Sequence, residues 1–339
     1  GYVVLTFIMM LGFYILLRAF GLSAWLAGLG GIIWAFSSYF FILIPAGHIW
    51  KFVTLAYIPP TIAGVVLAYR KKYLLGGVIT ALFIALQIQS NHIQMSYYFM
   101  FVILFFIIAY FVDAYEKKEL PHFFKASAIL ALAAVVGVCV NISNLYHTYE
   151  YSKETMRGKS ELKQEGPAAN QTSSGLDRDY ITNWSYGIGE TLTLLVPNVK
   201  GGGCSTTLSQ NETAMAKANP MYGNLYSQLT PYFGDQPWTA GPVYVGAFVV
   251  FLFILGCFIV KGPLKWALLG ATIFSILLSW GKNFMGLTDF FIDYIPMYNK
   301  FRAVSSILVI AEFTIPLLAI FALKEILSKP DILKLKCLL

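Results

Sequence analysis

Several basic side chains stand at turns next to long apolar stretches, where they could bind an anion. His48 and Lys51 are three residues apart at the start of one stretch, so they share a helix face. Lys300 and Arg302 precede a later stretch, and Lys282 follows another. Free N–H groups and the dipole at a helix N-terminus favour bound anions. We therefore expect a phosphate or pyrophosphate site, although these side chains could also extend to lipid headgroups, the favoured reading for Lys282.

A second turn carries polar side chains suited to hydrogen bonding. Asn91, Gln94 and Tyr98 are spaced i, i+3 and i+7, and His92 lies beside them. Like the turn with His48, this one places a histidine at the start of a predicted helix. The stripe could bind sugar hydroxyls, or it could form hydrogen bonds between helices.

Acidic residues offer candidates for a base that deprotonates a sugar hydroxyl, which must be a carboxylate or a histidine near the membrane face. Glu190 and Asp235 fit best, because each borders a stretch that returns toward the bilayer. Asp177 and Asp179 are spaced like an acidic metal-binding pair. We assign no metal ligands, and a divalent cation stays open as a cofactor. Glu312 is the one acid well inside an apolar stretch. It could be a proton site, a substrate site or a structural carboxylate that bonds to another helix.

The elements that must position these residues are membrane helices. The chain has 339 residues, of which 58% are hydrophobic and 12% are charged. A bilayer core of about 30 Å needs about 20 apolar residues in helical form. The sequence predicts an all-α polytopic membrane protein with about nine transmembrane helices. The predicted spans are residues 1–17, 22–44, 53–69, 73–89, 95–112, 126–145, 242–260, 264–280 and 304–323.

The distribution of basic residues predicts the orientation of these spans. Cytoplasmic loops are enriched in Lys and Arg, which assigns one set of connections to the cytoplasm. Its basic residues are Arg18, Arg70, Lys71, Lys72, Lys117, Lys118, Lys125, Lys261, Lys265, Lys324, Lys329, Lys334 and Lys336. The net charge of +7 therefore reflects topology, and no basic stripe for nucleic acid is present. An N-terminus outside and a C-terminal tail inside imply that at least one helix precedes Gly1 in the parent protein.

Three regions follow from this arrangement. Residues 1–145 hold six spans, 146–241 form a large extracytoplasmic loop, and 242–339 hold three spans and a cytoplasmic tail. Within the loop, Tyr146 to Leu162 could be an amphipathic helix continuing the sixth span, and Pro167 to Gly175 is typical of a flexible loop. The four cysteines lack the spacing of a disulfide framework or a zinc site.

Short motifs along most of the chain resemble the bacterial YfhO-like membrane protein family. They include Gly189 to Gly202, Tyr232 to Gly246 and Ile295 to Arg302, together with the turns around His48 and around Asn91 to Tyr98. The resemblance implies a GT-C type glycosyltransferase fold in the bacterial cytoplasmic membrane. It also implies a polyprenyl-phosphate sugar donor and an envelope acceptor.

Two departures from the family pattern bear on the catalytic residue. GT-C enzymes usually carry the catalytic acid in the first outer loop, which would precede Gly1. The family also tends to continue its Phe-Arg motif with Pro and a second Arg, where this chain has Ala303 to Ser306. The resemblance therefore implies a fold and a substrate class, and it leaves the catalytic acid open.

The first hypothesis is a lipid-linked sugar transferase. Arg302, Lys51 and His48, with Lys300 nearby, would neutralise the donor phosphate. Glu190 or Asp235 would serve the acceptor, and the Asn91 stripe with His92 and Gln94 would bind the sugar. Its partners would be the lipid-linked donor, membrane lipids and an envelope glycan or lipid.

Two alternatives remain open. One is a transporter or flippase for envelope lipids, which predicts broken helices at the midplane; Pro59-Pro60 would break the third span. The other is a non-catalytic membrane subunit of an envelope complex.

Overall fold

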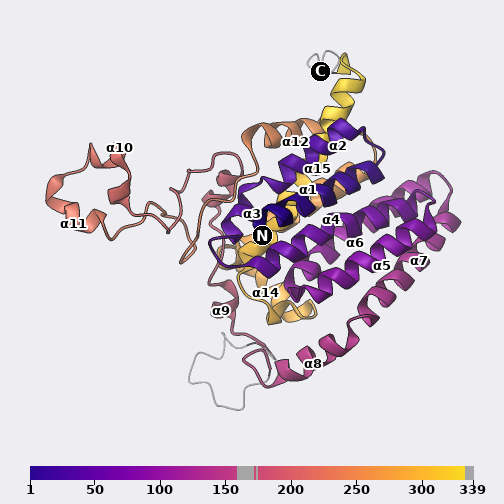
Figure 1. Ribbon diagram of the computed structural model, residues 1–339, viewed down its shortest axis with the longest axis horizontal. Coiled ribbons are helices and arrows are strands. Elements are labelled where there is room, and N and C mark those ends of the chain that lie inside the picture. Colours follow the sequence, from indigo (N-terminus) through magenta and orange to yellow (C-terminus); the bar gives the residue numbers. More distant parts are fainter. Residues whose placement is uncertain (159–171, 173–174, 333–339) are drawn as a thin grey trace.

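The computed structural model describes residues 1–158, 172 and 175–332, and within those residues it contains helices and no strand. The longer helices are α1 (Tyr2–Ala19), α2 (Ala24–Ala35), α3 (Ser38–Leu43), α4 (Ile49–Tyr69), α5 (Tyr73–Gln89), α6 (Ile93–Glu116), α7 (Leu120–Cys139), α8 (Ile142–Lys153), α12 (Ala247–Ile259), α13 (Pro263–Ser279), α14 (Met285–Tyr294) and α15 (Val309–Ser328). Figure 1 shows them as a bundle with a small lobe standing apart.

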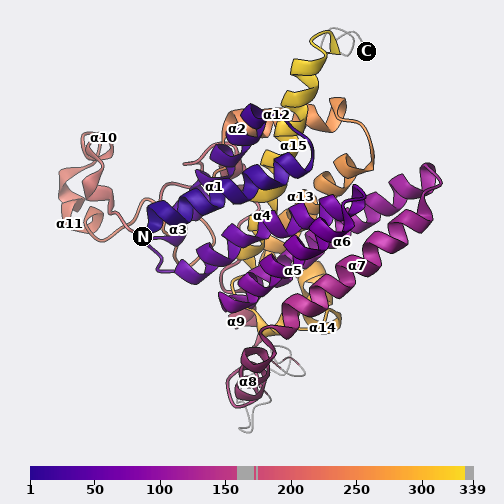
Figure 2. The same cartoon turned by 45° about the vertical axis from the view of Figure 1, so that its right-hand side comes forward.

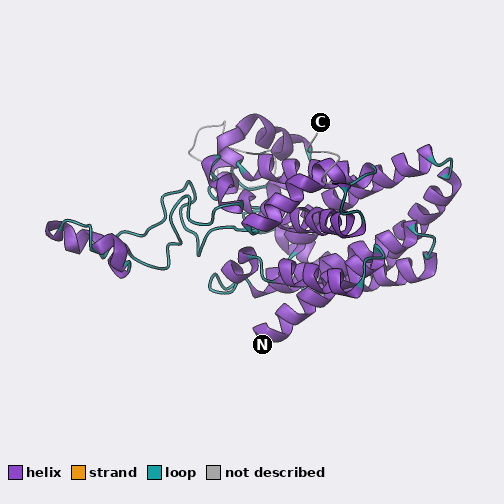
Figure 3. Cartoon of the chain, turned by 90° about the horizontal axis from the view of Figure 1, so that it is seen from above, coloured by secondary structure: helices purple, strands orange, loops and turns teal. Residues whose placement is uncertain are grey.

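The large loop and the segment before α15 contain short helices. They are α9 (Arg178–Thr182), η2 (Gly189–Leu194), η3 (Leu208–Gln210), α10 (Glu212–Met215), η4 (Pro220–Tyr222), α11 (Gly223–Tyr226), η5 (Gly281–Phe284), η6 (Tyr298–Lys300) and η7 (Val304–Leu308). The helices α10 and α11 form the lobe, which stands away from the bundle on two loop segments (Figures 1 and 3).

Six helical segments of the described chain are long and apolar enough to cross a membrane. They are Tyr2–Ala19, Ala24–Leu43, Ile49–Tyr69, Ile93–Glu116, Leu120–Cys139 and Val304–Ser328. A seventh is formed if Pro263–Ser279 and Gly281–Tyr294, bent by 109°, make one span. Two more predicted spans coincide with the shorter helices α5 (17 residues) and α12 (13 residues). These lengths and compositions are those of a multi-pass membrane protein.

The buried centre of the bundle is made by α15 and α4. In their apolar windows, 94% of the residues of α15 and 89% of those of α4 are buried. Figure 2 shows α15 among α2, α12 and α13, which it contacts. Aromatic side chains fill the core around Trp34, whose ring centroid lies 5.4 Å from Phe13, 4.5 Å from Phe40 and 5.6 Å from Phe313. Such interlocking rings fix the helices that carry the site.

Small residues let α4 and α5 approach closely. A Cβ atom added to Gly76 would lie 2.5 Å from the Ala68 amide nitrogen and 2.6 Å from the Gly64 carbonyl oxygen. Helix pairs in membranes commonly pack through such glycines. The helix α4 also runs unbroken through Pro59 and Pro60, so the predicted break of the third span is wrong. The packed neighbours hold α4 together despite the hydrogen bonds that two prolines remove.

The segment after α7 differs from the expected continuous helix. The chain turns at Val140 and Asn141, and α8 begins as a separate element and ends at Lys153. Residues 159–162 of the predicted helix lie outside the described residues, as does nearly all of the predicted loop from Pro167 to Gly175. None of the residues of α8 is buried, so it lies on the surface of the bundle.

Candidate anion-binding site

One pocket gathers the basic side chains that the sequence places in separate turns. It has a volume of about 390 Å³ and lies where the turn before α4, the turn before α6, the segment after α9 and η7 meet. Its lining includes the basic side chains of Lys51, Arg157 and Arg302, together with His48 and His92. No Asp or Glu is among its lining residues. An uncompensated cluster of cations is a site for an anion.

Lys51 forms the buried part of this cluster. His48 is the N-cap residue of α4, and Lys51 follows in the first turn, so the helix start directs both into the same space. The Lys51 side chain is only 8% exposed, and its Nζ donates to Ser306 Oγ at 3.0 Å. Among the described residues, it has no carboxylate partner within 4.0 Å. A buried ammonium without a counter-ion is costly, which favours a ligand that supplies the negative charge.

Arg302 approaches the same pocket from a constrained backbone. Met297 and Ala303, with φ of 67° and 58°, adopt the left-handed conformation on either side of it. Arg302 Nη1 donates to the Tyr180 hydroxyl at 2.7 Å. The guanidinium also lies 5.5 Å from the Tyr180 ring centroid and 5.9 Å from that of Trp184. These contacts orient a rigid cation that can still donate to an anion. Left-handed non-glycine residues are common where a functional side chain must be held in place.

The two histidines of the pocket are neutral near pH 7. Burial, and then the charges of Lys51 and Arg302, lower the pKa of His48. Burial, and then Lys51, lower the pKa of His92 to about 4. His92 is the N-cap residue of α6, and its Nδ1 is buried without a hydrogen-bond partner. A bound anion would reverse the electrostatic part of these shifts.

Glu190 and Asp235 are brought together beside this pocket. An ideal Cβ atom at Gly187 would lie 3.0 Å from Glu190 Oε2 and 3.1 Å from Asp235 Oδ2. Glu190 is 2% exposed and lies outside the lining of the cation pocket. It accepts from Gly187 N at 2.6 Å, Asp235 N at 3.1 Å and the Tyr232 hydroxyl at 2.5 Å. Burial and this bond raise the Tyr232 pKa.

These bonds occupy the Glu190 carboxylate, whereas Asp235 is exposed. Asp235 Oδ2 accepts from Asn283 Nδ2 at 2.9 Å, and the same amide donates to the Tyr186 carbonyl at 3.0 Å. The next residue, Gln236, lines the cation pocket together with Tyr186. Of the two predicted acids, only Asp235 therefore leaves its carboxylate exposed beside the pocket.

The structure assigns the other predicted residues different positions. Gln94 lines the pocket, and its Nε2 donates to the Tyr98 hydroxyl at 2.9 Å and to the Arg302 carbonyl at 2.8 Å. Asn91 is exposed, with φ of 57°, outside the helix and the pocket lining, so only part of the predicted stripe faces the site. Lys300 does not line the pocket, but its Nζ donates to the Arg157 carbonyl at 2.7 Å.

The remaining predicted residues lie outside the lining of the cation pocket. Lys282 Nζ donates to the Asp235 carbonyl at 3.2 Å, and Lys282 does not line the cation pocket. Asp177 is the N-cap residue of α9 and Asp179 lies in its first turn. In the described part of the chain, no group of three His, Cys, Asp or Glu side chains is arranged to hold a metal ion.

Several pocket residues were missed by sequence reasoning. Arg157, Trp184, Gln236 and Ser306 come from loop segments or from a 3-10 turn. For Arg157, Trp184 and Gln236 the sequence signal is the unusual length of the loop 146–241, since loops longer than about 15 residues are often functional; Ser306 lies outside that loop, in η7.

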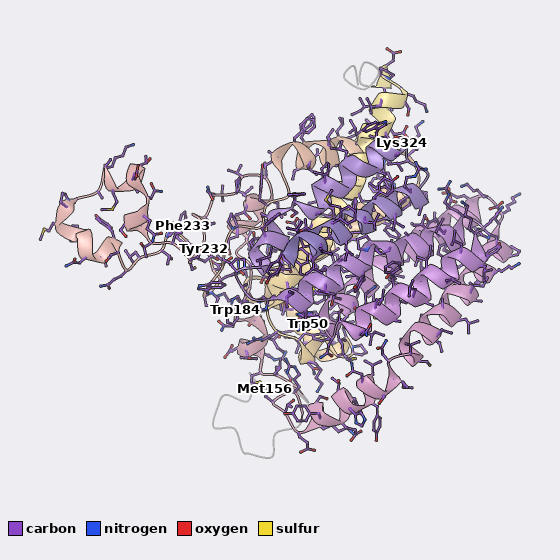
Figure 4. All side chains as sticks on the ribbon, in the orientation of Figure 1. Trp50, Met156, Trp184, Tyr232, Phe233 and Lys324 are labelled. Atoms are coloured by element: carbon purple, nitrogen blue, oxygen red, sulfur yellow. The ribbon has the colours of Figure 1, made fainter. Side chains whose placement is uncertain are left out.

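Apolar side chains form one wall of the same pocket. Ile42 and Leu43 come from α3, Ala46 from the turn that follows, and Val243 from the segment before α12. The α2–α3 segment is itself a candidate membrane span, so this wall adjoins the apolar part of the bundle. An anionic group attached to a hydrocarbon chain would contact both the basic side chains and the apolar wall of this pocket. Figure 4 labels Trp184, one of the pocket residues, at this end of the bundle.

Neither family models nor curated proteins nor solved structures show a match to this chain. The functional interpretation below therefore depends on the geometry of the site.

Proposed function

We propose that this protein is a membrane glycosyltransferase of the GT-C class, which transfers a sugar from a polyprenyl-phosphate donor to an acceptor of the cell envelope. The observation that carries the proposal is the buried Lys51 ammonium, which faces a cationic pocket without a carboxylate. The adjoining apolar wall fits a lipid-linked phosphate better than a soluble one.

The pocket would stabilise the leaving group of the transfer. The bond between the sugar anomeric carbon and the donor phosphate oxygen breaks, while a bond to the acceptor oxygen forms. The lipid phosphate thereby gains negative charge, and Lys51 and Arg302 neutralise it. The acceptor hydroxyl loses its proton to Asp235, and Glu190 positions the Asp235 backbone through its hydrogen bond. Gln94, together with the neighbouring aromatic residues, would bind the sugar.

The proposal includes a topology. We propose about nine spans in a bacterial cytoplasmic membrane, with the pocket and the loop 146–241 on the extracytoplasmic side, and the charge bias of the short loops supports this orientation. A lipid-linked donor and an envelope acceptor meet on that side. The cations of the pocket are among the few basic residues of the short loops that the bias assigns to the outside, which favours a role in binding over a role in topology.

The test is sugar transfer by the purified protein, with a panel of polyprenyl-phosphate sugars and envelope acceptors. Arg302→Ala should lower the transfer rate by about 100-fold or more, because a transition-state charge contact is lost. The matched control is Lys217→Ala, which removes an exposed cation of the loop 146–241, away from the pocket lining.

Equal transfer by Arg302→Ala and the wild type would contradict the assigned role of Arg302. Binding of the donors without transfer over the whole panel would contradict the enzyme and leave the transporter or the scaffold subunit. Absence of both binding and transfer from a folded protein would contradict the anion site as well.

A further inference from the structure

A second hollow lies at the opposite end of the bundle, between the start of α2 and the end of α15. It has a volume of about 510 Å³ and includes Trp25, Leu26 and Leu29 on α2, and Leu323 and Leu327 on α15. Trp25 is 90% exposed and Leu327 is 63% exposed. Figure 4 shows Lys324 at this end, far from Trp184 at the first pocket. The hollow has an apolar body, as an acyl chain requires.

One cation lines this groove, and two more are bonded to the loop beside it. Lys324 lines it, with its side chain 46% exposed, and the nearest carboxylate oxygen is that of its neighbour Glu325 at 3.9 Å. Arg18 Nη1 donates to the Leu22 carbonyl at 2.9 Å, and Arg70 Nη1 donates to the Ala19 carbonyl. Both arginines are thereby held at the loop that forms one wall of the groove.

Gly21 brings Arg70 close to this wall. A Cβ atom at Gly21 would lie only 3.1 Å from Arg70 Nη1, and the φ of 84° is also one that favours glycine. Gly21 itself lines the groove, and no Asp or Glu is among the lining residues. The groove therefore joins a cationic mouth to an apolar body.

We propose that this groove binds an anionic phospholipid, with the headgroup phosphate near Lys324 and Arg70 and an acyl chain along the leucines of α2 and α15. Charge complementarity decides between this occupant and a neutral lipid, because Lys324 lines the groove and Arg18 and Arg70 are held at its wall, while no Asp or Glu is among the lining residues. The exposed indole of Trp25 has the amphipathic character of residues at a membrane interface. The groove lies on the face that the basic loops assign to the cytoplasm, where anionic lipids attract such cations. This site is independent of the proposed transferase activity.

The test uses Trp25 as a reporter in bilayers of phosphatidylcholine. Brominated phosphatidylglycerol or brominated phosphatidylcholine is added at the same low fraction, and the quenching of tryptophan fluorescence is measured. The difference between the wild type and Trp25→Phe isolates the Trp25 contribution. Phosphatidylglycerol should quench this contribution several-fold more effectively than the neutral lipid. Lys324→Gln should reduce the preference by about fivefold, the effect of one cation near an anionic surface.

The matched control is Lys329→Gln, which removes an exposed cation just beyond the groove and should leave the preference unchanged. Equal quenching by the two lipids in the wild type would overturn the proposal and indicate bulk lipid as the occupant. A preference that Lys324→Gln and Lys329→Gln reduce equally would also overturn it, because it would reflect the general charge of the surface.

Discussion

Lys51 Nζ lies 3.0 Å from Ser306 Oγ, so a buried ammonium at the start of α4 is fixed to the segment that leads into α15. A hydroxyl can accept a hydrogen bond from an ammonium, but it cannot neutralise the charge. The two most buried membrane helices therefore meet at an uncompensated cation. A site that is costly without its ligand is expected to gain both affinity and stability when an anion binds.

Lys51→Met should separate stability from binding. The substitution removes a buried charge and keeps an unbranched side chain, so the anion-free protein should be as stable as the wild type or more stable. Binding of inorganic pyrophosphate should weaken by about 10-fold to 100-fold, the value of a charged hydrogen bond. Thermal unfolding in detergent, with and without pyrophosphate, measures both quantities. Lys217→Met is the control, and a marked loss of stability in anion-free Lys51→Met would indicate a structural role.

Ala303 should tolerate glycine but not a branched side chain. Its φ of 58° costs about 1–2 kcal/mol for a residue with a Cβ atom. We expect Ala303→Gly to raise stability by up to about 1 kcal/mol and to leave anion binding unchanged, because Arg302 keeps its contacts. Ala303→Val should lower stability and weaken sulfate binding by about tenfold, because a β-branched residue disfavours this backbone.

Met297→Gly serves as the matched control for the two Ala303 variants, since it relieves the strain of a left-handed backbone five residues before Arg302. Denaturant unfolding and sulfate titration check both effects. Wild-type sulfate binding by Ala303→Val would show that this backbone conformation does not position Arg302.

Anion binding should strengthen as the pH falls. The free site has neutral histidines, because the pKa of His92 is lowered to about 4 and that of His48 is lowered as well. A bound dianion raises both pKa values, so the complex holds more protons than the free protein. Affinity for sulfate, whose charge is constant in this range, should rise about threefold to tenfold from pH 7.5 to pH 5.

Stability of the anion-free protein should change in the opposite direction. An unfolded histidine takes up a proton near pH 6.5, whereas His92 in the folded protein does so near pH 4. The stability contributed by neutral His92 is therefore complete above pH 6.5 and is lost as the pH falls toward 4.

Sulfate titrations at several pH values test the coupling between anion binding and histidine protonation. Retention of the full pH dependence by the double variant His48→Gln and His92→Gln would refute the assignment to these residues.

The two acids beside the pocket should respond differently to amide substitution. Glu190→Gln places an NH₂ group among three donors, so we expect a loss of about 3 kcal/mol of stability, as for a broken charged hydrogen bond. The free energy of unfolding of Asp235→Asn should lie within about 1 kcal/mol of the wild-type value, because the Asp235 side chain is exposed. If Asp235 is the base, sugar transfer by Asp235→Asn should fall by about 100-fold or more. Unchanged transfer would remove Asp235 from the mechanism.

The sequence alone predicted the membrane class and the types of residue at the site. Long apolar stretches indicate membrane helices because each satisfies its own backbone hydrogen bonds, a property of local sequence. The positions of His48 and His92 at the starts of α4 and α6 could also be predicted from local sequence, since a helix begins where polar turn residues give way to an apolar stretch. The unbroken course of α4 through Pro59 and Pro60 could not be predicted from local sequence, because the packing of neighbouring helices decides it.

Only the tertiary structure decided which cations meet. Lys51 and Arg302 are far apart in the sequence, and the packing of α15 against the rest of the bundle brings η7 beside the start of α4. The same packing leaves Asn91 outside the pocket and surrounds the Glu190 carboxylate with donors. Hydropathy and spacing describe one helix at a time, whereas a binding site depends on distances between helices. For that reason the sequence suggested an anion site, and only the fold showed that its buried cation has no counter-ion.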